Sequence, residues 1–193
     1  MRRAALAALA LLSACARAPR GPYAVFETSK GRMVARLYVD AAPKTVAHLR
    51  ALADGALPWR DPKTGARVSR PLYDGTIFHR VIPGFMIQGG DPAGTGAGDP
   101  QTPVPDELSS SKFDRAGLLG MASWGPGTSQ SQFFITLAPA PDLDGRHTVF
   151  GELVSGLDVA RAIASVPRDQ TSGDDRPLDP PVLKSLRVVD ARP

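Results

Sequence analysis

The chain has 193 residues, of which 23 are lysine or arginine and 19 are aspartate or glutamate, so its formal net charge is +4. This length suits a single domain, and the interspersed charges, with no basic run that alternates with aromatic residues, argue against a nucleic-acid-binding protein. The sequence holds one cysteine, which excludes an internal disulfide.

The chain begins with a leader. Arg2 and Arg3 precede an uncharged apolar stretch, residues 4–14, that is too short to span a bilayer and is typical of a secretory signal peptide over residues 1–14. Cys15 follows Leu-Ser-Ala, which resembles a bacterial lipobox, where the cysteine is acylated and becomes the mature N-terminus. Residues 15–22 are then the lipid anchor and a short tether. The alternative is a plain signal peptide with an incidental cysteine.

A hairpin and a helix are predicted next. Residues 23–28 and 32–38 are strand-like and are joined through Ser-Lys-Gly, which is a hairpin signal. Pro43 suits the first turn of a helix, because its missing N–H would have had no partner there, and Gly55 ends the helix. The expected apolar face of this helix carries Val46, Leu49, Leu52 and Ala53.

Short strands and loops follow. Residues 57–72 contain three prolines, several charges and one tryptophan, and we interpret them as a surface loop without a catalytic role. Strands are expected over residues 76–81 and 85–88, before a loop over residues 91–105. The glycines of residues 94–98 superficially suggest a phosphate-binding loop, but the Lys-Ser/Thr ending of such loops is missing.

The rest of the chain completes a mainly β pattern. The remaining expected elements are strands over residues 117–121, 132–136, 148–153 and 182–189 and a second helix over residues 158–164. Many short strands with two helices indicate a β-barrel, in which closure removes exposed strand edges.

Three segments mix polar and apolar residues in a way that a core strand does not need. Residues 78–91, FHRVIPGFMIQGGD, place an arginine and a glutamine among large apolar side chains. Residues 121–135 read MASWGPGTSQSQFFI, and residues 143–151 read LDGRHTVFG. Because burying an unpaired charge is costly, this mixture favours a site that holds an apolar group and acts on a polar backbone.

Together these segments resemble the cyclophilin family of peptidyl-prolyl cis-trans isomerases, and the resemblance spans roughly residues 23–189. It implies an eight-stranded antiparallel closed β-barrel with two capping α-helices over residues 23–190. It also implies an enzyme that accelerates cis-trans isomerisation of X-Pro bonds without a cofactor. A metal site is not expected, because His48, His79 and His147 lack the spacing of a ligand set.

The resemblance also assigns roles to individual residues. Arg80 matches the catalytic arginine of the family. The matched substrate-binding positions are Phe85, Met86, Gln88, Ala122, Ser123, Gln132, Phe134, Leu143 and His147. Asp142 stands where many cyclophilins have an aromatic residue that helps to bind cyclosporin, so we expect weak cyclosporin binding. Ser123 stands where the best-known members have asparagine, which is a smaller change. Strand alternation indicates that one of Phe133 and Phe134 belongs to the core and that His79 faces away from Arg80.

The expected partners are proline-containing segments of unfolded or exported proteins, and the membrane if Cys15 is acylated. We expect a monomer in the periplasm or cell envelope, outside the cytoplasmic membrane. The alternative is a cyclophilin-like binding module that holds proline-containing segments with little turnover. The presence of Arg80 and the matched groove residues favours the enzyme.

Overall fold

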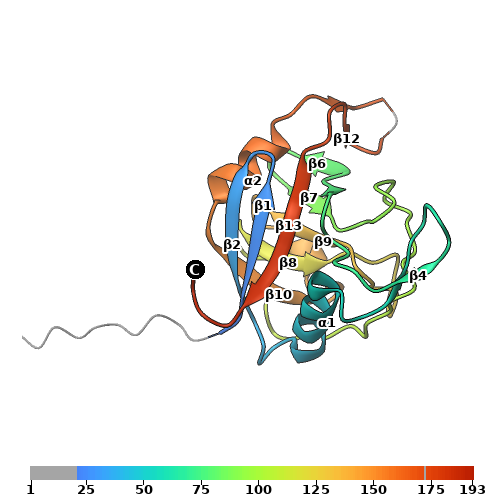
Figure 1. Ribbon diagram of the computed structural model, residues 1–193. Helices are drawn as coiled ribbons and strands as arrows, with labels where there is room; N and C mark the ends of the chain where they lie inside the picture. Colours follow the sequence, from blue (N-terminus) through green and yellow to red (C-terminus); the bar gives the residue numbers. More distant parts are fainter. Residues whose placement is uncertain (1–20, 172) are drawn as a thin grey trace, which may run out of the picture.

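The computed structural model describes residues 21–171 and 173–193, so the proposed signal peptide and Cys15 lie outside the described residues. Its main element is a nine-stranded antiparallel sheet that curls around a core (Figure 1). In order across the sheet, the strands are β5 (Thr76–Ile77), β13 (Val182–Val189), β1 (Tyr23–Thr28), β2 (Gly31–Leu37), β10 (Val149–Ser155), β8 (Leu118–Met121), β9 (Phe133–Thr136), β7 (Met86–Gly89) and β6 (Arg80–Ile82).

The expected closed barrel of eight strands is replaced by a curled sheet with two edges. Residues 76–81, expected as one strand, divide into β5 and β6, because β5 pairs with β13 while β6 pairs with β7 at the opposite edge. The chain crosses between the edges at Phe78 and His79. In the described part of the chain, an isolated antiparallel bridge from Ile77 to Asp91 links the two ends of the sheet.

The other expected elements are present, with ends that differ by at most two residues. Helix α1 (Pro43–Asp54) buries Val46, Leu49, Leu52 and Ala53, as predicted. Gly55 ends the helix in the left-handed conformation with φ of 74°, which glycine adopts without steric cost. Helix α2 (Leu157–Ala164) begins one residue earlier than expected.

The first turn of α1 is capped from a distant loop. Ala42, which precedes the helix, offers no side-chain cap. Instead the Glu107 carboxylate accepts hydrogen bonds from the backbone N–H groups of Lys44 and Thr45, at 3.0 and 2.8 Å, and from the Thr45 hydroxyl at 2.8 Å. A carboxylate is favoured at this end of a helix, because the free N–H groups carry partial positive charge.

Two small hairpins extend from the main sheet. The expected loop over residues 57–72 contains β3 (Trp59–Arg60) paired with β4 (Arg67–Val68). Trp59 is buried and donates its indole N–H to the backbone oxygen of Arg70 at 2.8 Å, while the Arg70 guanidinium lies 4.8 Å from the indole centroid. The second hairpin, described below, pairs β11 (Arg168–Asp169) with β12 (Arg176–Pro177).

The main core fills the concave side of the sheet. Phe133 lies near its centre and contacts the rings of Phe26, Tyr73 and Phe78, with centroid separations of 5.5, 6.0 and 6.4 Å. Residues of both helices join the same apolar cluster. Figure 1 shows α1 at the lower end of the curled sheet and α2 at its upper left. Among the described residues, none of the helices is both long and apolar enough to cross a lipid bilayer.

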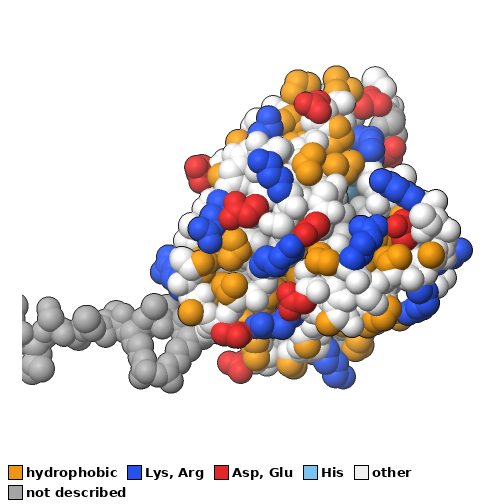
Figure 2. All heavy atoms as spheres, in the orientation of Figure 1, with side chains coloured by type: hydrophobic (Ala, Val, Ile, Leu, Met, Phe, Trp, Pro, Cys, Tyr) orange, Lys and Arg blue, Asp and Glu red, His pale blue; other side chains and the backbone are white. Residues whose placement is uncertain are grey.

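Charges are mixed on the face that Figure 2 presents, where lysine and arginine side chains lie among aspartates and glutamates. One ion pair joins Arg187 of β13 to Asp74, in the turn before β5, at 2.6 Å. The face shows no broad basic patch of the kind that binds nucleic acid.

Candidate active site

The site is built on one row of cross-strand neighbours. The register places Arg80 of β6 opposite Gln88 of β7, Gln88 opposite Phe134 of β9, and Phe134 opposite Gly120 of β8. Residues directly opposite one another in antiparallel strands project from the same face. The register therefore brings Arg80, Gln88 and Phe134 together on the convex face of the sheet.

This convex face carries an apolar cluster of its own. Phe134 packs there with Met86 and with Phe113, whose ring centroid lies 5.3 Å from that of Phe134. The neighbouring residues Phe133 and Ile87 belong to the main core instead. The prediction that one residue of the Phe133–Phe134 pair is core is confirmed, and the alternation of a strand is the reason.

A groove of about 640 Å³ lies over this face. It is lined by every residue predicted for the site, namely Arg80, Phe85, Met86, Gln88, Ala122, Ser123, Gln132, Phe134, Leu143 and His147. These residues come from β6, β7, β9, the turn before β7, the loop after β8 and the segment before β10. The structure thus gathers them around one space, and their individual roles stay predictions.

Two glutamines cross the floor of the groove. The side-chain amide of Gln88 donates to Oε1 of Gln132 at 2.9 Å, and Nε2 of Gln132 donates to the backbone oxygen of Gly96 at 2.9 Å. These two hydrogen bonds tie β7, the residue before β9 and the loop after β7 together. The floor is therefore polar along one line while Phe134, Met86 and Leu143 supply the apolar part.

His147 is held in one orientation. Its Nδ1 lies 3.0 Å from the backbone oxygen of Met121, which accepts hydrogen bonds only, so Nδ1 carries the hydrogen. The hydroxyl of Ser123 lies 3.5 Å from the same nitrogen. The ring meets Phe134 edge to face, with centroids 5.6 Å apart. This packing makes His147 a wall of the groove.

Arg80 is half-buried, and its guanidinium makes no ion pair with a carboxylate among the residues that the structure describes. An arginine keeps its positive charge and can donate up to five hydrogen bonds. Beside the apolar surface of Phe85 and Phe134, this guanidinium is available as a donor to a polar group of a bound ligand.

Sequence reasoning missed part of the lining, because those residues come from irregular segments. Residues 95–98 form one wall, and the buried Asp91 carboxylate shapes it by accepting hydrogen bonds from the N–H groups of Ala93, Thr95, Gly96 and Gly98. Trp124, Thr128 and Gln130 of the loop after β8 are the second missed set. The glycine-rich composition of residues 94–98 was the available signal for the first set.

The hairpin of β11 and β12 contributes the remaining missed residues, Gly173, Asp174 and Arg176. Arg176 donates to the backbone oxygen of Gly94 at 2.6 Å, and Arg168 pairs with Asp175 at 3.2 Å. These contacts fix the hairpin beside the groove.

His79 borders the groove as well, next to Arg80. The expectation that the two face opposite ways assumed a continuous strand, but residue 79 lies between β5 and β6. His79 is buried, and neither ring nitrogen has a hydrogen-bond partner among the described residues. Burial is the main cause that lowers the pKa of His79. The positive charges of Arg176 and Arg80 lower this pKa further, while the negative charge of Asp91 acts to raise it.

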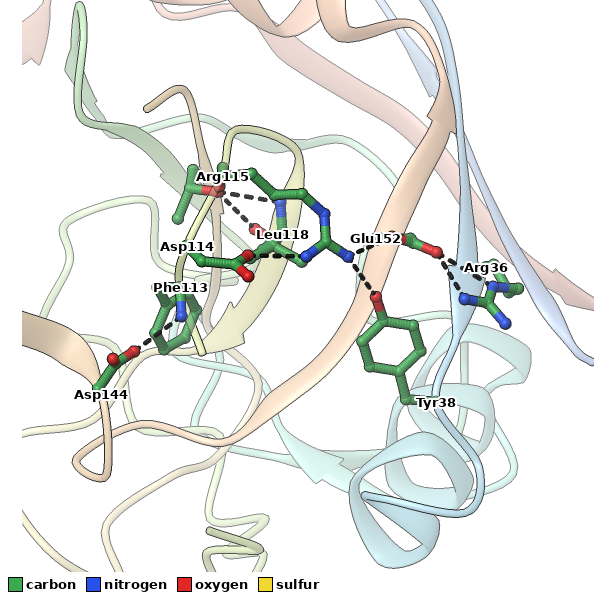
Figure 3. A network of polar contacts seen from close by, with 9 residues as sticks. Arg36, Tyr38, Phe113, Asp114, Arg115, Leu118, Asp144 and Glu152 are labelled. Carbon is green, nitrogen blue, oxygen red and sulfur yellow. Dashed lines mark hydrogen bonds and ion pairs between the residues drawn. The ribbon is translucent and has the colours of Figure 1, made fainter. Parts of the chain in front are cut away.

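A polar network joins Glu152, Arg36, Arg115 and Tyr38 (Figure 3). Glu152 accepts hydrogen bonds from Arg36 and Arg115, each at 2.6 Å, and Arg115 also lies 3.3 Å from the Tyr38 hydroxyl. Burial by itself would raise the pKa of Glu152, but the hydrogen bonds from Arg115 and Arg36 outweigh it and lower the pKa to about 2. Burial, with the charge of Glu152, raises the pKa of Tyr38 to about 12.

The same network reaches the groove through Phe113. Asp144, next to Leu143, accepts a hydrogen bond from the backbone N–H of Phe113 at 2.7 Å. The backbone oxygen of Phe113 accepts from the N–H of Ala140 at 2.7 Å. The ring that packs against Phe134 is therefore fixed by main-chain contacts on both sides.

No cluster of three or more potential metal-ligating side chains occurs among the described residues.

Comparison with known proteins identifies the family. The family model described as "Cyclophilin type peptidyl-prolyl cis-trans isomerase/CLD" matches residues 23–188. Peptidyl-prolyl cis-trans isomerase B of Streptomyces anulatus is 46% identical over 173 residues, which cover 88% of this chain and 97% of that protein. Peptidyl-prolyl cis-trans isomerase A of Mycobacterium tuberculosis is 44% identical over 166 residues, which cover 86% of this chain and 91% of that protein.

A solved structure agrees with these matches. The crystal structure of a cyclophilin type peptidyl-prolyl cis-trans isomerase from Cryptosporidium parvum superposes with a TM-score of 0.73 at 32% sequence identity, covering 89% of this chain and 98% of that chain. The family match, the curated relatives and the shared fold all extend over the part of the chain that builds the groove. The chain belongs to the cyclophilin-type peptidyl-prolyl cis-trans isomerases.

Proposed function

We propose that the groove accelerates cis-trans isomerisation of X-Pro bonds, with Arg80 as the catalytic donor and without a covalent intermediate. The observation that carries this proposal is the placement of Arg80, which has no carboxylate partner among the described residues, in the same groove as Phe85, Met86 and Phe134. Proline-containing polypeptides are the proposed substrates. In support, a cyclophilin from Cryptosporidium parvum, 32% identical to this chain, has been solved in the presence of the dipeptide Ala-Pro.

The chemistry requires no nucleophile, base or metal. Rotation about an X-Pro amide crosses a barrier of about 18–20 kcal/mol, because it breaks the partial double bond between carbon and nitrogen. In the twisted transition state the carbonyl is less polar and the prolyl nitrogen gains a lone pair. An apolar pocket lined by Phe134, Met86 and Leu143 therefore disfavours the planar state relative to the twisted one. The Arg80 guanidinium donates to the developing lone pair or to the adjacent carbonyl oxygen.

Magnitudes show that Arg80 does not act alone. Raising the rate constant of isomerisation from about 10⁻² to about 10³ per second requires the activation free energy to fall by roughly 7 kcal/mol. A hydrogen bond from a charged donor contributes about 1.5–3 kcal/mol. The remainder comes from the apolar pocket and from holding the peptide in a bent conformation, which requires the groove walls to be in place before the substrate binds.

An assay of cis-to-trans conversion in short proline peptides tests this function. Wild-type protein is expected to accelerate the slow phase, and Arg80→Ala to lower kcat/KM by about 10- to 100-fold, which corresponds to about 1.5–3 kcal/mol. Arg80→Lys keeps the charge but loses the planar donor geometry, so we expect an intermediate loss. Arg161→Ala, at an exposed position on α2, is the matched control and should retain wild-type activity.

The same assay separates the enzyme from the alternative, a binding module for proline-containing segments. A binding module would bind these peptides while leaving the slow phase unchanged in both wild-type and Arg80→Ala protein. Such a result would overturn the catalytic proposal.

We also propose that the chain is an exported lipoprotein that assists folding of exported proteins outside the cytoplasmic membrane. The support is the leader sequence, with Cys15 after Leu-Ser-Ala, together with the isomerase family. Acyl chains on Cys15 would hold the protein at a membrane with roughly 0.8 kcal/mol per buried CH₂ group. A mass measurement tests this: the mature protein should begin at a diacylated Cys15, and Cys15→Ser should release it from the membrane fraction. An unmodified N-terminus elsewhere would overturn the proposal.

A further inference from the structure

One large apolar side chain at the groove is left in water. Trp124 is 82% exposed, more than any other large hydrophobic residue among those described, whereas Trp59 is 2% exposed. Tryptophan is on average one of the more buried residues of folded proteins, and an exposed indole contributes nothing to the core. The position of Trp124 in the lining of the groove therefore requires an explanation beyond folding.

The loop that carries Trp124 is fixed without a ligand. The backbone N–H of Trp124 donates to the Thr128 hydroxyl at 2.8 Å, and that hydroxyl donates to the backbone oxygen of Gly125 at 2.8 Å. Asp106 secures the far side of the turn, because its carboxylate accepts from the N–H of Gly127 at 2.7 Å and from the Ser129 hydroxyl at 2.9 Å. A residue held in this way loses little conformational freedom when it binds a partner.

Trp124 lines the same groove as the apolar residues Phe85, Met86 and Phe134. Ala122, two residues before it, is bound through its backbone N–H to the oxygen of Gln132 at 3.0 Å, and so belongs to the floor of the groove. Besides Trp124, the loops after β7 and β8 contribute uncharged residues to the lining, among them Thr95, Gly96, Ala97, Gly98, Thr128 and Gln130. The charged lining residues Arg80, Asp174 and Arg176 come from β6 and from the β11–β12 hairpin instead.

We propose that Trp124 determines specificity by packing against a large apolar side chain, aromatic or long aliphatic, that flanks the proline of the substrate polypeptide. This inference rests on the proposed function of the same groove. The loops after β7 and β8 contribute only uncharged residues to the lining, and tryptophans in rigid surroundings are among the residues that contribute most to binding. An aromatic contact adds to the apolar area that binding removes from water.

Paired peptides test this proposal. Each pair contains the same proline and differs by Ala or Phe at one position within three residues of it, and each position is tested in turn. At one of these positions, wild-type protein is expected to show a kcat/KM about tenfold higher for the Phe peptide, which corresponds to about 1.4 kcal/mol. Trp124→Ala should bring this ratio close to one. Leu178→Ala removes another side chain that is 72% exposed, outside the groove lining, and should keep the wild-type ratio.

Fluorescence provides a second readout that does not depend on turnover. Because Trp59 is buried, a shift in emission on binding the Phe peptide reports Trp124, and Trp124→Phe should remove the shift while keeping part of the preference. An unchanged ratio in Trp124→Ala, or a preference for Lys and Arg peptides over Phe peptides, would overturn the inference. If wild-type protein accelerates no peptide, the proposed function fails, while the emission measurement still decides the role of Trp124.

Discussion

The ring of Phe134 occupies the space above Gly120, its cross-strand neighbour. A Cβ atom at residue 120 would lie 2.7 Å from Cε1 and from Cε2 of the ring and closer still to Cζ. Any residue other than glycine on β8 at this point would therefore push the ring into the groove. The shape of the groove at Phe134 depends on the absence of a side chain at residue 120 as much as on the aromatic ring itself.

Gly120→Ala should accordingly lower kcat/KM in the proline-peptide assay by at least tenfold and lower the free energy of unfolding by about 1–3 kcal/mol, the usual cost of overpacking. Gly21→Ala is the control, because a Cβ there meets its nearest atom at 3.7 Å. Near-wild-type activity of Gly120→Ala would show that the ring can move aside without loss.

Gln132 links two sides of the groove, since it accepts from Gln88 and donates to the backbone of Gly96. Gln132→Ala removes both hydrogen bonds and frees the wall formed by residues 95–98. We expect KM to rise more than kcat falls, because residues 95–98 line the groove but are not among the residues proposed to act on the rotating bond. The steady-state parameters of the peptide assay check this.

The matched control is Gln170→Ala, an exposed glutamine outside the groove lining, which should leave both constants unchanged. A loss confined to kcat in Gln132→Ala would instead indicate that this side chain acts on the twisted bond.

Glu107 caps α1 from outside the helix, and Glu107→Ala leaves two backbone N–H groups of the first turn without their acceptor. Loss of such a cap costs about 1–2 kcal/mol of unfolding free energy, or about 2–8 °C in Tm for a domain of this size. Thermal unfolding measures it. Glu27→Ala is the control, because the Glu27 side chain is 47% exposed and pairs only with the exposed Arg32, so its Tm change should be below about 2 °C.

Glu152 should give the protein a specific acid sensitivity. Its pKa is lowered from 4.5 to about 2 in the folded chain. A carboxyl group whose pKa is depressed by folding stabilises the native state fully above its unfolded pKa, and this contribution is lost as the pH falls through the folded pKa. The free energy of unfolding should therefore decrease between about pH 4.5 and pH 2.

Glu152→Gln removes the titrating group and should flatten this part of the curve of unfolding free energy against pH. At pH 7 the variant should be less stable by about 1–2 kcal/mol, because the charged hydrogen bonds to Arg36 and Arg115 are weakened in a partly exposed network. Denaturant unfolding at a series of pH values measures both effects. If the curves of unfolding free energy against pH were parallel for wild-type and Glu152→Gln protein, Glu152 would not be the group responsible for the acid sensitivity.

The sequence was sufficient for much of this structure. The hairpin after residue 22, the helix between Pro43 and Gly55 and the closing strand were all predicted from turn residues and periodicity, which are local signals. The residues predicted for the site lie in three continuous motifs, and the structure gathers them around one groove. Strand register then explains why Arg80 and Phe134, which are 54 residues apart in the chain, lie on one face.

The errors arose where contacts between distant segments decide the conformation. The break between β5 and β6 depends on which partner each strand finds, and no local signal in residues 76–81 records that choice. The hairpin of β3 and β4 forms around Trp59, whose indole is held by the backbone of Arg70. The wall at residues 95–98 depends on a single buried carboxylate, Asp91, which composition alone does not distinguish from a solvent-exposed loop residue.

The apolar cluster of the convex face, which contains Phe134 and Met86, is separate from the main core. Because Phe134 belongs to the separate cluster, a ligand can bind over the convex face without opening the main core. Under the function proposed above, a long polypeptide can be bound and released at successive prolines while the main core stays closed.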